Sequence, residues 1–136
     1  MGALVDTSVL VAAVKDEVHS AWSQAKLAEH PDFMVSPMVL SELRFGVIAA
    51  RNNSAIEMRR QATVTFAERF PCVAITSETA AIHARVMAEL RALGLVRVRT
   101  HDLWIAASAL EHGLTLITCN RRDFADIRGL KFTAPE

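Results

Sequence analysis

Short apolar runs alternate with longer segments of helical periodicity along the whole chain. Ala3, Leu4 and Val5 form the first run, and 114–118 is the most strongly apolar one. Runs this short are typical of buried strands, and strands that alternate with helices are joined by crossover connections. The sequence therefore predicts an α/β fold with a central, mainly parallel sheet flanked by helices. We expect four or five strands, at 3–5, 33–35, 72–75, 114–118 and, at an edge, 131–133.

The helical segments are bounded by residues that commonly cap helices. Ser36 followed by Pro37 is a favourable helix start, and Gly94 is placed to end a helix. Gly46 weakens the helix that contains it, so we expect another group to approach the backbone there. Helices are expected from 9, from 16 to 29, and at 37–51, 54–69, 77–93 and 100–112. Of these, 37–51 and 54–69 should form an antiparallel pair.

The 136 residues suit a single domain that spans 1–136 around one hydrophobic core. Lys and Arg together number 15, as do Asp and Glu, so the formal net charge is zero. This balance argues against a module that binds nucleic acid through bulk positive charge, but not against a local site. Cys72 and Cys119 have neither metal-site spacing nor a disulfide framework, which fits a reducing cytoplasm. Asp6 interrupts the N-terminal apolar run, so we expect no signal peptide, and no apolar run approaches a membrane span.

Asp6 stands where the first strand ends and the first helix begins. On its own, an Asp at such a place is most simply interpreted as a helix N-cap. However, ligands of open parallel sheets bind at the carboxyl ends of the strands, where Asp6 is expected to lie. Its role therefore depends on whether other segments bring further carboxylates to the same edge.

Three more acids are candidates for that edge. Asp102 begins a helix of small and apolar residues, and Asp123 follows the last core strand. Glu42 lies inside a helix, where a solvated Glu is the ordinary case, but its apolar neighbours indicate a face that packs. Clustered carboxylates repel one another unless a cation compensates them, and all-oxygen sites suit Mg²⁺ or Mn²⁺. Such an ion can activate a water and neutralise charge at a phosphodiester.

At this point the chain resembles a known family. The matching blocks are Val-Asp-Thr-Ser at 5–8, Ser-Glu-Leu-Arg-Phe-Gly at 41–46, Asp-Leu-Trp-Ile-Ala-Ala at 102–107, and Leu-Ile-Thr-Cys-Asn at 116–120 followed by Asp123-Phe124. Their order and spacing resemble the PIN-domain ribonucleases, in particular the VapC-type toxins of bacterial toxin–antitoxin pairs. Any single block is weak, whereas the ordered set is specific and covers essentially the whole chain. The resemblance implies a three-layer PIN-like fold and an endoribonuclease that uses Mg²⁺ or Mn²⁺.

The resemblance also assigns roles to individual residues. Asp6, Glu42 and Asp102 match the family's metal-binding, catalytic acids. Family members often carry a fourth acid where this chain has Asn120. Three alternatives stay open: Asn120 completes the site, Asp123 completes it, or only three acids bind metal. Whether the site holds one ion or two depends on which of them applies.

Other polar residues are expected to support the acids rather than to react. Ser8 and Thr118 are similar to groups that orient acids or waters. The implied reaction is hydrolysis by an activated water, without a nucleophilic side chain. Phosphate contact is a hypothesis for four arginines, for which a solvated surface charge is equally compatible: Arg97, Arg99, Arg121 and Arg122. The histidines are expected at surface or capping positions: His19, His30, His83, His101 and His112.

The resemblance further implies an RNA substrate, a homodimer and a small antitoxin that holds the cytoplasmic toxin inactive. One alternative is a PIN-fold RNA-processing nuclease without an antitoxin. Another is a receiver-like signalling module that binds Mg²⁺ and is not an enzyme. A receiver needs paired acids after its first strand, whereas Asp6 is followed by Thr7. It also needs an Asp after the third strand and a Lys after the last, and neither is present in the expected places.

Overall fold

The computed structural model describes residues 2–15, 18–95 and 100–136. Three strands form a parallel sheet in the order β1-β2-β3: β1 (Ala3–Val5), β2 (Thr115–Ile117) and β3 (Phe132–Thr133). Leu116 lies opposite Leu4 on one side and Phe132 on the other. The first strand is therefore joined directly to segments from the far end of the chain. The predicted α/β class and parallel pairing are confirmed.

Two further segments extend the sheet beyond β1, but only as isolated bridges. Met34 pairs in parallel with Leu4, and Val35 pairs in parallel with Cys72. The expected strands at 33–35 and 72–75 are thus shorter than predicted, and three regular strands replace the predicted four or five. Val35 is followed at once by the cap of the next helix, which leaves no room for a longer strand.

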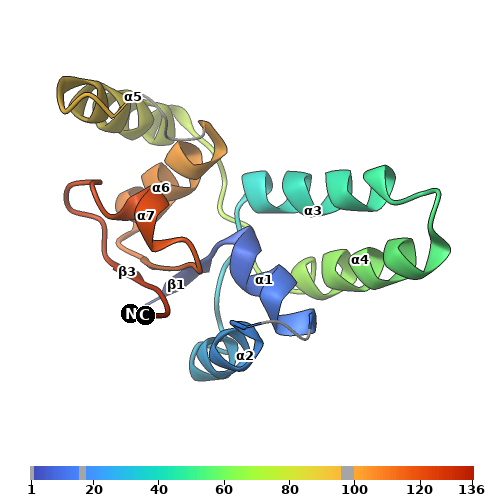
Figure 1. The fold of residues 1–136 in the computed structure, drawn as a ribbon. Coiled ribbons are helices and arrows are strands. Elements are labelled where there is room, and N and C mark those ends of the chain that lie inside the picture. Colours follow the sequence, from blue (N-terminus) through green and yellow to red (C-terminus); the bar gives the residue numbers. More distant parts are fainter. Residues whose placement is uncertain (1, 16–17, 96–99) are drawn as a thin grey trace.

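Helices surround this sheet (Figure 1). The described ones are α1 (Thr7–Val14), α2 (Ser20–Glu29), α3 (Pro37–Ala49), α4 (Ser54–Ala67), α5 (Ser77–Ala92), α6 (Thr100–His112) and α7 (Arg121–Phe124). The first helix begins two residues earlier than expected, and α2 begins at Ser20 rather than at 16. None of the described helices combines the length and apolar character that crossing a membrane would require.

Local chemistry explains where several helices begin and end. The Ser36 hydroxyl accepts a hydrogen bond from the Val39 N–H over 3.2 Å, and Pro37 occupies the first turn of α3, as predicted. Gly94 follows α5 with a φ of 75°, a left-handed conformation that favours glycine. Both predicted helix boundaries are confirmed.

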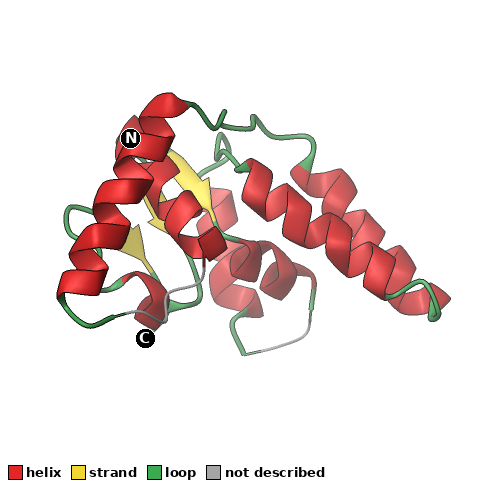
Figure 2. Cartoon of the chain, turned by 90° about the horizontal axis from the view of Figure 1, so that it is seen from above, coloured by secondary structure: helices red, strands yellow, loops and turns green. Residues whose placement is uncertain are grey.

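The helices α3 and α4 form the expected antiparallel pair, which extends away from the sheet (Figures 1 and 2). Arg44 and Glu68 form an ion pair of 2.7 Å between them. Arg60 of α4 also donates to the Gly46 carbonyl oxygen over 2.7 Å. Arg60 is therefore the group that approaches the backbone at Gly46.

The core fixes the carboxyl ends of the two central strands. Leu4 and Val5 of β1, and Leu116 and Ile117 of β2, are completely buried. Ile105 of α6 is completely buried with them in one cluster. Because these side chains lock β1 and β2 in register, the residues that follow them, 6–8 and 118–120, are held side by side.

Candidate functional site

Asp6 is held by three hydrogen bonds from its surroundings. Its Oδ1 accepts from the backbone N–H of Thr7 over 2.9 Å, so it is indeed the N-cap of α1. Its Oδ2 accepts from the hydroxyl groups of Ser8, over 3.0 Å, and Thr118, over 2.8 Å. Helix capping thus uses one carboxylate oxygen, while two hydroxyl groups orient the other.

The two hydroxyl groups are themselves tied to the turn after β2. The Ser8 oxygen accepts from the Cys119 N–H over 3.0 Å, and the Thr118 oxygen accepts from the Asn120 N–H over 3.0 Å. Each hydroxyl therefore accepts from a backbone N–H and donates to Asp6. This arrangement matches the orienting role that the resemblance implies for Ser8 and Thr118.

Burial makes Asp6 electrostatically unusual. The residue is only 3% exposed, and this burial raises the pKa of its carboxyl group above the usual value. The hydrogen bonds from Thr118, Ser8 and Thr7 oppose that rise, while the negative charge of Asp123 adds to it. A carboxylate in this position gains from a nearby cation, which would offset the cost of its burial.

Asp6 lies in a cleft of about 560 Å³ that two of the other predicted acids, Glu42 and Asp102, also line. Asp102 lies in the first turn of α6 and is buried, and Glu42 comes from α3. The lining residues are Asp6, Thr7, Ser8, Val11, Ala12, Val18, His19, Glu42, Asp102, Cys119 and Asn120. Three separate segments therefore bring Asp6, Glu42 and Asp102 to one cleft.

Asn120 and Asp123, the two candidates for a fourth position, are placed differently. Asn120 is among the residues that line the cleft, and Asp123 is not. Asp123 lies on α7 and acts on Asp6 through its charge. Asn120 is thus better placed to offer an oxygen to a ligand in the cleft.

The arginines give no direct support for a phosphate contact. Arg121 donates to the Ala134 carbonyl oxygen over 3.1 Å, and its guanidinium lies 5.6 Å from the centre of the Phe132 ring. Arg122 is exposed on α7. Arg97 and Arg99 lie outside the described residues.

The donor set of the cleft fits a hard divalent cation. Carboxylates from Asp6, Glu42 and Asp102 and the side-chain amide oxygen of Asn120 are oxygen ligands of the kind that Mg²⁺ and Mn²⁺ prefer. Within residues 2–15, 18–95 and 100–136, no three His, Cys, Asp or Glu side chains are grouped in a geometry that could hold a metal ion. The three carboxylates line the cleft without closing on a common point, so water and substrate oxygens would have to complete the coordination of an ion there.

A family comparison adds independent evidence. The PIN-domain family model matches residues 3–130 of this chain. The chain belongs to the PIN-domain family. That assignment excludes the receiver-like alternative, whose paired acids are also missing.

Similar PIN-domain proteins support the assignment along the whole length. Ribonuclease VapC1 of Rickettsia felis is 32% identical, over 96% of this chain and 94% of that protein. The solved VapBC-5 structure from Mycobacterium tuberculosis, a member of a toxin–antitoxin family, is 30% identical with a TM-score of 0.79. The match covers 98% of both chains. VapBC2 of Rickettsia felis, bound to a promoter DNA fragment, has a TM-score of 0.81 at 23% identity and covers both chains completely, which supports the fold.

Two histidines lie near the acids, which the sequence pattern did not indicate. His101 is exposed, as expected, with its Nδ1 3.8 Å from Glu42 Oε1, and His19, the N-cap residue of α2, also lines the cleft. The position of His101 beside Asp102 in the sequence was the one available indication. His83 is buried instead, with its ring stacked on Trp104 at 4.0 Å, which corrects the expected surface position.

Proposed function

We propose that this PIN domain is a metal-dependent endoribonuclease that hydrolyses RNA phosphodiester bonds and acts as the toxin of a toxin–antitoxin pair. One observation carries the proposal: Asp6, Glu42 and Asp102 come from three segments to line a single cleft. The relatives named Ribonuclease VapC support the choice of RNA as substrate. The free cysteines Cys72 and Cys119 are consistent with action in the cytoplasm.

The proposed cofactor is Mg²⁺ or Mn²⁺, held by Asp6, Glu42 and Asp102. Asn120 offers its side-chain oxygen, and Asp123 contributes charge from outside the cleft. When bound, the ion supplies water activation and neutralises charge that develops at the phosphodiester. These residues do not need to surround the ion completely, since substrate phosphate and water provide the remaining ligands.

The chain itself contributes position and orientation to this reaction. Ser8 and Thr118 hold one oxygen of Asp6, and the Thr7 N–H holds the other, so the carboxylate cannot rotate freely. Their own bonds to the 119–120 backbone keep both hydroxyl hydrogens directed at Asp6. Preorganised ligands of this kind reduce the cost of assembling the reactive arrangement.

Cleavage of structured RNA tests the enzymatic part of the proposal. The purified protein is incubated with RNA in Mg²⁺, in Mn²⁺ or in EDTA, beside Asp6→Asn and the control Asp32→Asn, an exposed acid outside the cleft. We expect cleavage by the wild type and by the control with metal, and none in EDTA or by Asp6→Asn. Cleavage that survives both EDTA and Asp6→Asn would refute a metal-dependent nuclease.

The toxin role and the homodimer require separate measurements. Expression of the chain in bacteria should arrest growth, Asp6→Asn should not, and co-expression of a small protein encoded beside it should restore growth. Cleavage without growth arrest would fit an RNA-processing nuclease instead. Light scattering should give twice the 14.9 kDa mass of the chain if it forms the proposed dimer.

A further inference from the structure

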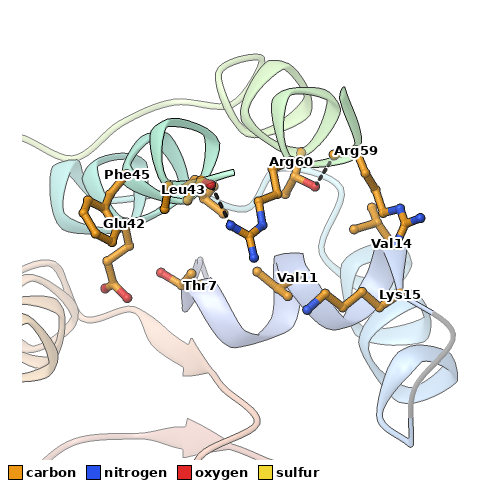
Figure 3. Close-up of a pocket in the computed structure, with 12 residues that line it drawn as sticks. Thr7, Val11, Val14, Lys15, Glu42, Leu43, Phe45, Arg59 and Arg60 are labelled. Carbon is orange, nitrogen blue, oxygen red and sulfur yellow. Dashed lines mark hydrogen bonds between the residues drawn. The ribbon is translucent and has the colours of Figure 1, made fainter. Parts of the chain in front are cut away.

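A second cavity, of about 230 Å³, lies between α1, α3 and α4 (Figure 3). We propose that it is a nucleotide subsite, which takes the base and a flanking phosphate of an RNA residue near the cleaved bond. The proposal rests on the ribonuclease function above and adds to it a determinant of substrate choice. Such a determinant is needed because the acids of the cleft cannot distinguish one base from another.

The cavity adjoins the acid cleft. Thr7, Val11 and Glu42 line both of them. In Figure 3, Thr7 and Glu42 stand at one end of the cavity, while Lys15 and Arg59 stand at the other. A single-stranded RNA that leaves the acid cleft along α1 would therefore enter this cavity next.

The walls of the cavity suit an unstacked base. Val11, Val14, Leu43 and Ala49 make them largely apolar. Phe45 lies at the rim and is 69% exposed, so its ring is available to a ligand. Proteins commonly bind single-stranded RNA by stacking its bases on aromatic rings and arginine planes.

Positive charge lies where the RNA backbone would pass. Arg59 and Arg60 line the cavity, and Lys15 lines it at the end away from Thr7 and Glu42. Arg60 is fixed by its bond to the Gly46 carbonyl oxygen, so its guanidinium is already directed into the space between the helices. A chain with zero net charge can attract a polyanion only through such local placement, and the acid cleft alone would repel one.

Charge and ring chemistry favour RNA over an uncharged apolar ligand in this cavity. Arg59 and Arg60 can attract phosphate, and the exposed Phe45 ring can stack on a base.

The test measures RNA binding without cleavage, in the Asp6→Asn background with Mg²⁺ present. Phe45→Ala and Arg59→Gln are compared with matched controls outside the cavity, Ile48→Ala on α3 and Arg91→Gln on α5. Fluorescence anisotropy gives the Kd for a single-stranded RNA and for a series in which each successive residue is abasic. We expect Phe45→Ala to weaken binding roughly 10-fold, as loss of one base-stacking contact does.

Two further readouts identify the contacts. In the abasic series, removal of the base at one position should weaken binding to the protein that retains Phe45. The same RNA should bind Phe45→Ala no more weakly than the intact RNA does. Arg59→Gln should reduce the slope of log Kd against log salt by about 0.7, the value for one phosphate contact in a single strand. Neither control should change these readouts.

The nucleotide subsite would be refuted if both variants and both controls bound RNA with equal affinity and no abasic position weakened binding. The cavity would then be a candidate site for a protein segment. The outcome is separable from failure of the ribonuclease function. A protein that cleaves RNA yet shows no effect of Phe45→Ala loses only the subsite. A protein that neither binds nor cleaves RNA loses both proposals.

Discussion

The hydroxyl group of Thr118 donates to Asp6 Oδ2 over 2.8 Å, although 112 residues separate the two in the chain. Thr118 is completely buried and lies directly after β2, while Asp6 lies directly after β1. The hydroxyl also accepts from the Asn120 N–H. Thr118 is therefore a positioning residue, whose oxygen connects the Asp6 carboxylate to the turn that carries Asn120.

Thr118→Val tests this role, because valine keeps the shape and removes the hydroxyl. We expect the free energy of unfolding to fall by about 1–3 kcal/mol, since the Asn120 N–H loses its acceptor. Metal affinity should fall roughly 10- to 100-fold, as it does when a group that supports a ligand is removed. Urea unfolding and calorimetric Mg²⁺ titration measure the two effects. Thr118→Ser, which keeps the hydroxyl, should restore both, and an unchanged Mg²⁺ affinity in Thr118→Val would exclude a positioning role.

The raised pKa of Asp6 predicts how stability depends on pH without metal. The folded protein holds the Asp6 proton more tightly than the unfolded chain, whose reference pKa is 3.8. The contribution of Asp6 to stability therefore falls as pH rises from that value through the raised pKa. Asp6→Asn removes this titration, so its stability relative to wild type should increase with pH. Melting in EDTA between pH 4 and 7 provides the test, and a constant difference between the two proteins would contradict it.

Divalent metal should raise the melting temperature. A ligand that binds only the folded state stabilises it by about 2.7 kcal/mol at 100 times its Kd. We expect Mg²⁺ to stabilise the wild type and Asp32→Asn equally, and Asp6→Asn much less. Thermal melting at constant ionic strength distinguishes site binding from general screening. The same melting temperature with and without Mg²⁺ would count against the acid cleft as a metal site.

The buried His83 predicts a second pH effect, of opposite sign. Burial lowers the pKa of His83, so the folded state resists its protonation. Stability from this residue is present above the reference value of 6.5 and is lost as pH falls from there through the lowered pKa. His83→Phe keeps a ring to stack on Trp104 and should flatten the pH dependence of melting below pH 6.5. The exposed His112→Gln serves as the control, and equal slopes for wild type and His83→Phe would refute the prediction.

Gly46→Ala should stabilise the protein, although Gly46 belongs to one of the blocks that resemble the family. A methyl group there would meet the Arg60 Cδ at 3.6 Å, an ordinary contact distance. Alanine in a helix interior is favoured over glycine by about 0.5–1 kcal/mol. Urea unfolding should show a gain of that size with Arg60 still bonded to the residue 46 carbonyl. A loss of stability would mean that the α3–α4 contact tolerates no added atom.

Two of the three acids that line the cleft were predictable from local sequence, whereas Glu42, inside a helix, was indicated by its apolar neighbours and by the family resemblance. Asp6 follows an apolar run, and Asp102 begins a buried helix, so both positions depend on nearby residues. Asp6 can be both a helix N-cap and a site residue, since its two carboxylate oxygens have different partners. The choice between helix cap and site residue, which the sequence posed as alternatives, does not arise in the folded protein.

Other features depend on contacts between distant segments and could not be predicted in this way. The isolated bridges at Met34 and Val35 depend on where Leu4 and Cys72 lie, far from them in the chain. The approach of His101 to Glu42 depends on how α3 and α6 pack, as does the stacking of His83 on Trp104 across α5 and α6. Asn120 lines the cleft rather than Asp123 because a turn and a short helix follow β2.

The pairing of β1 with β2 has a consequence for the timing of synthesis. Residues 3–5 leave the ribosome early in synthesis. Their partners at 115–117, and the β3 residues that pair with 116 and 117, leave it near the end. Until then Asp6 has neither the Thr118 hydroxyl nor the backbone of the following turn beside it. A partly synthesised chain therefore lacks a formed cleft, and the ribosome completes almost the whole polypeptide before an RNA-cutting activity can exist beside it.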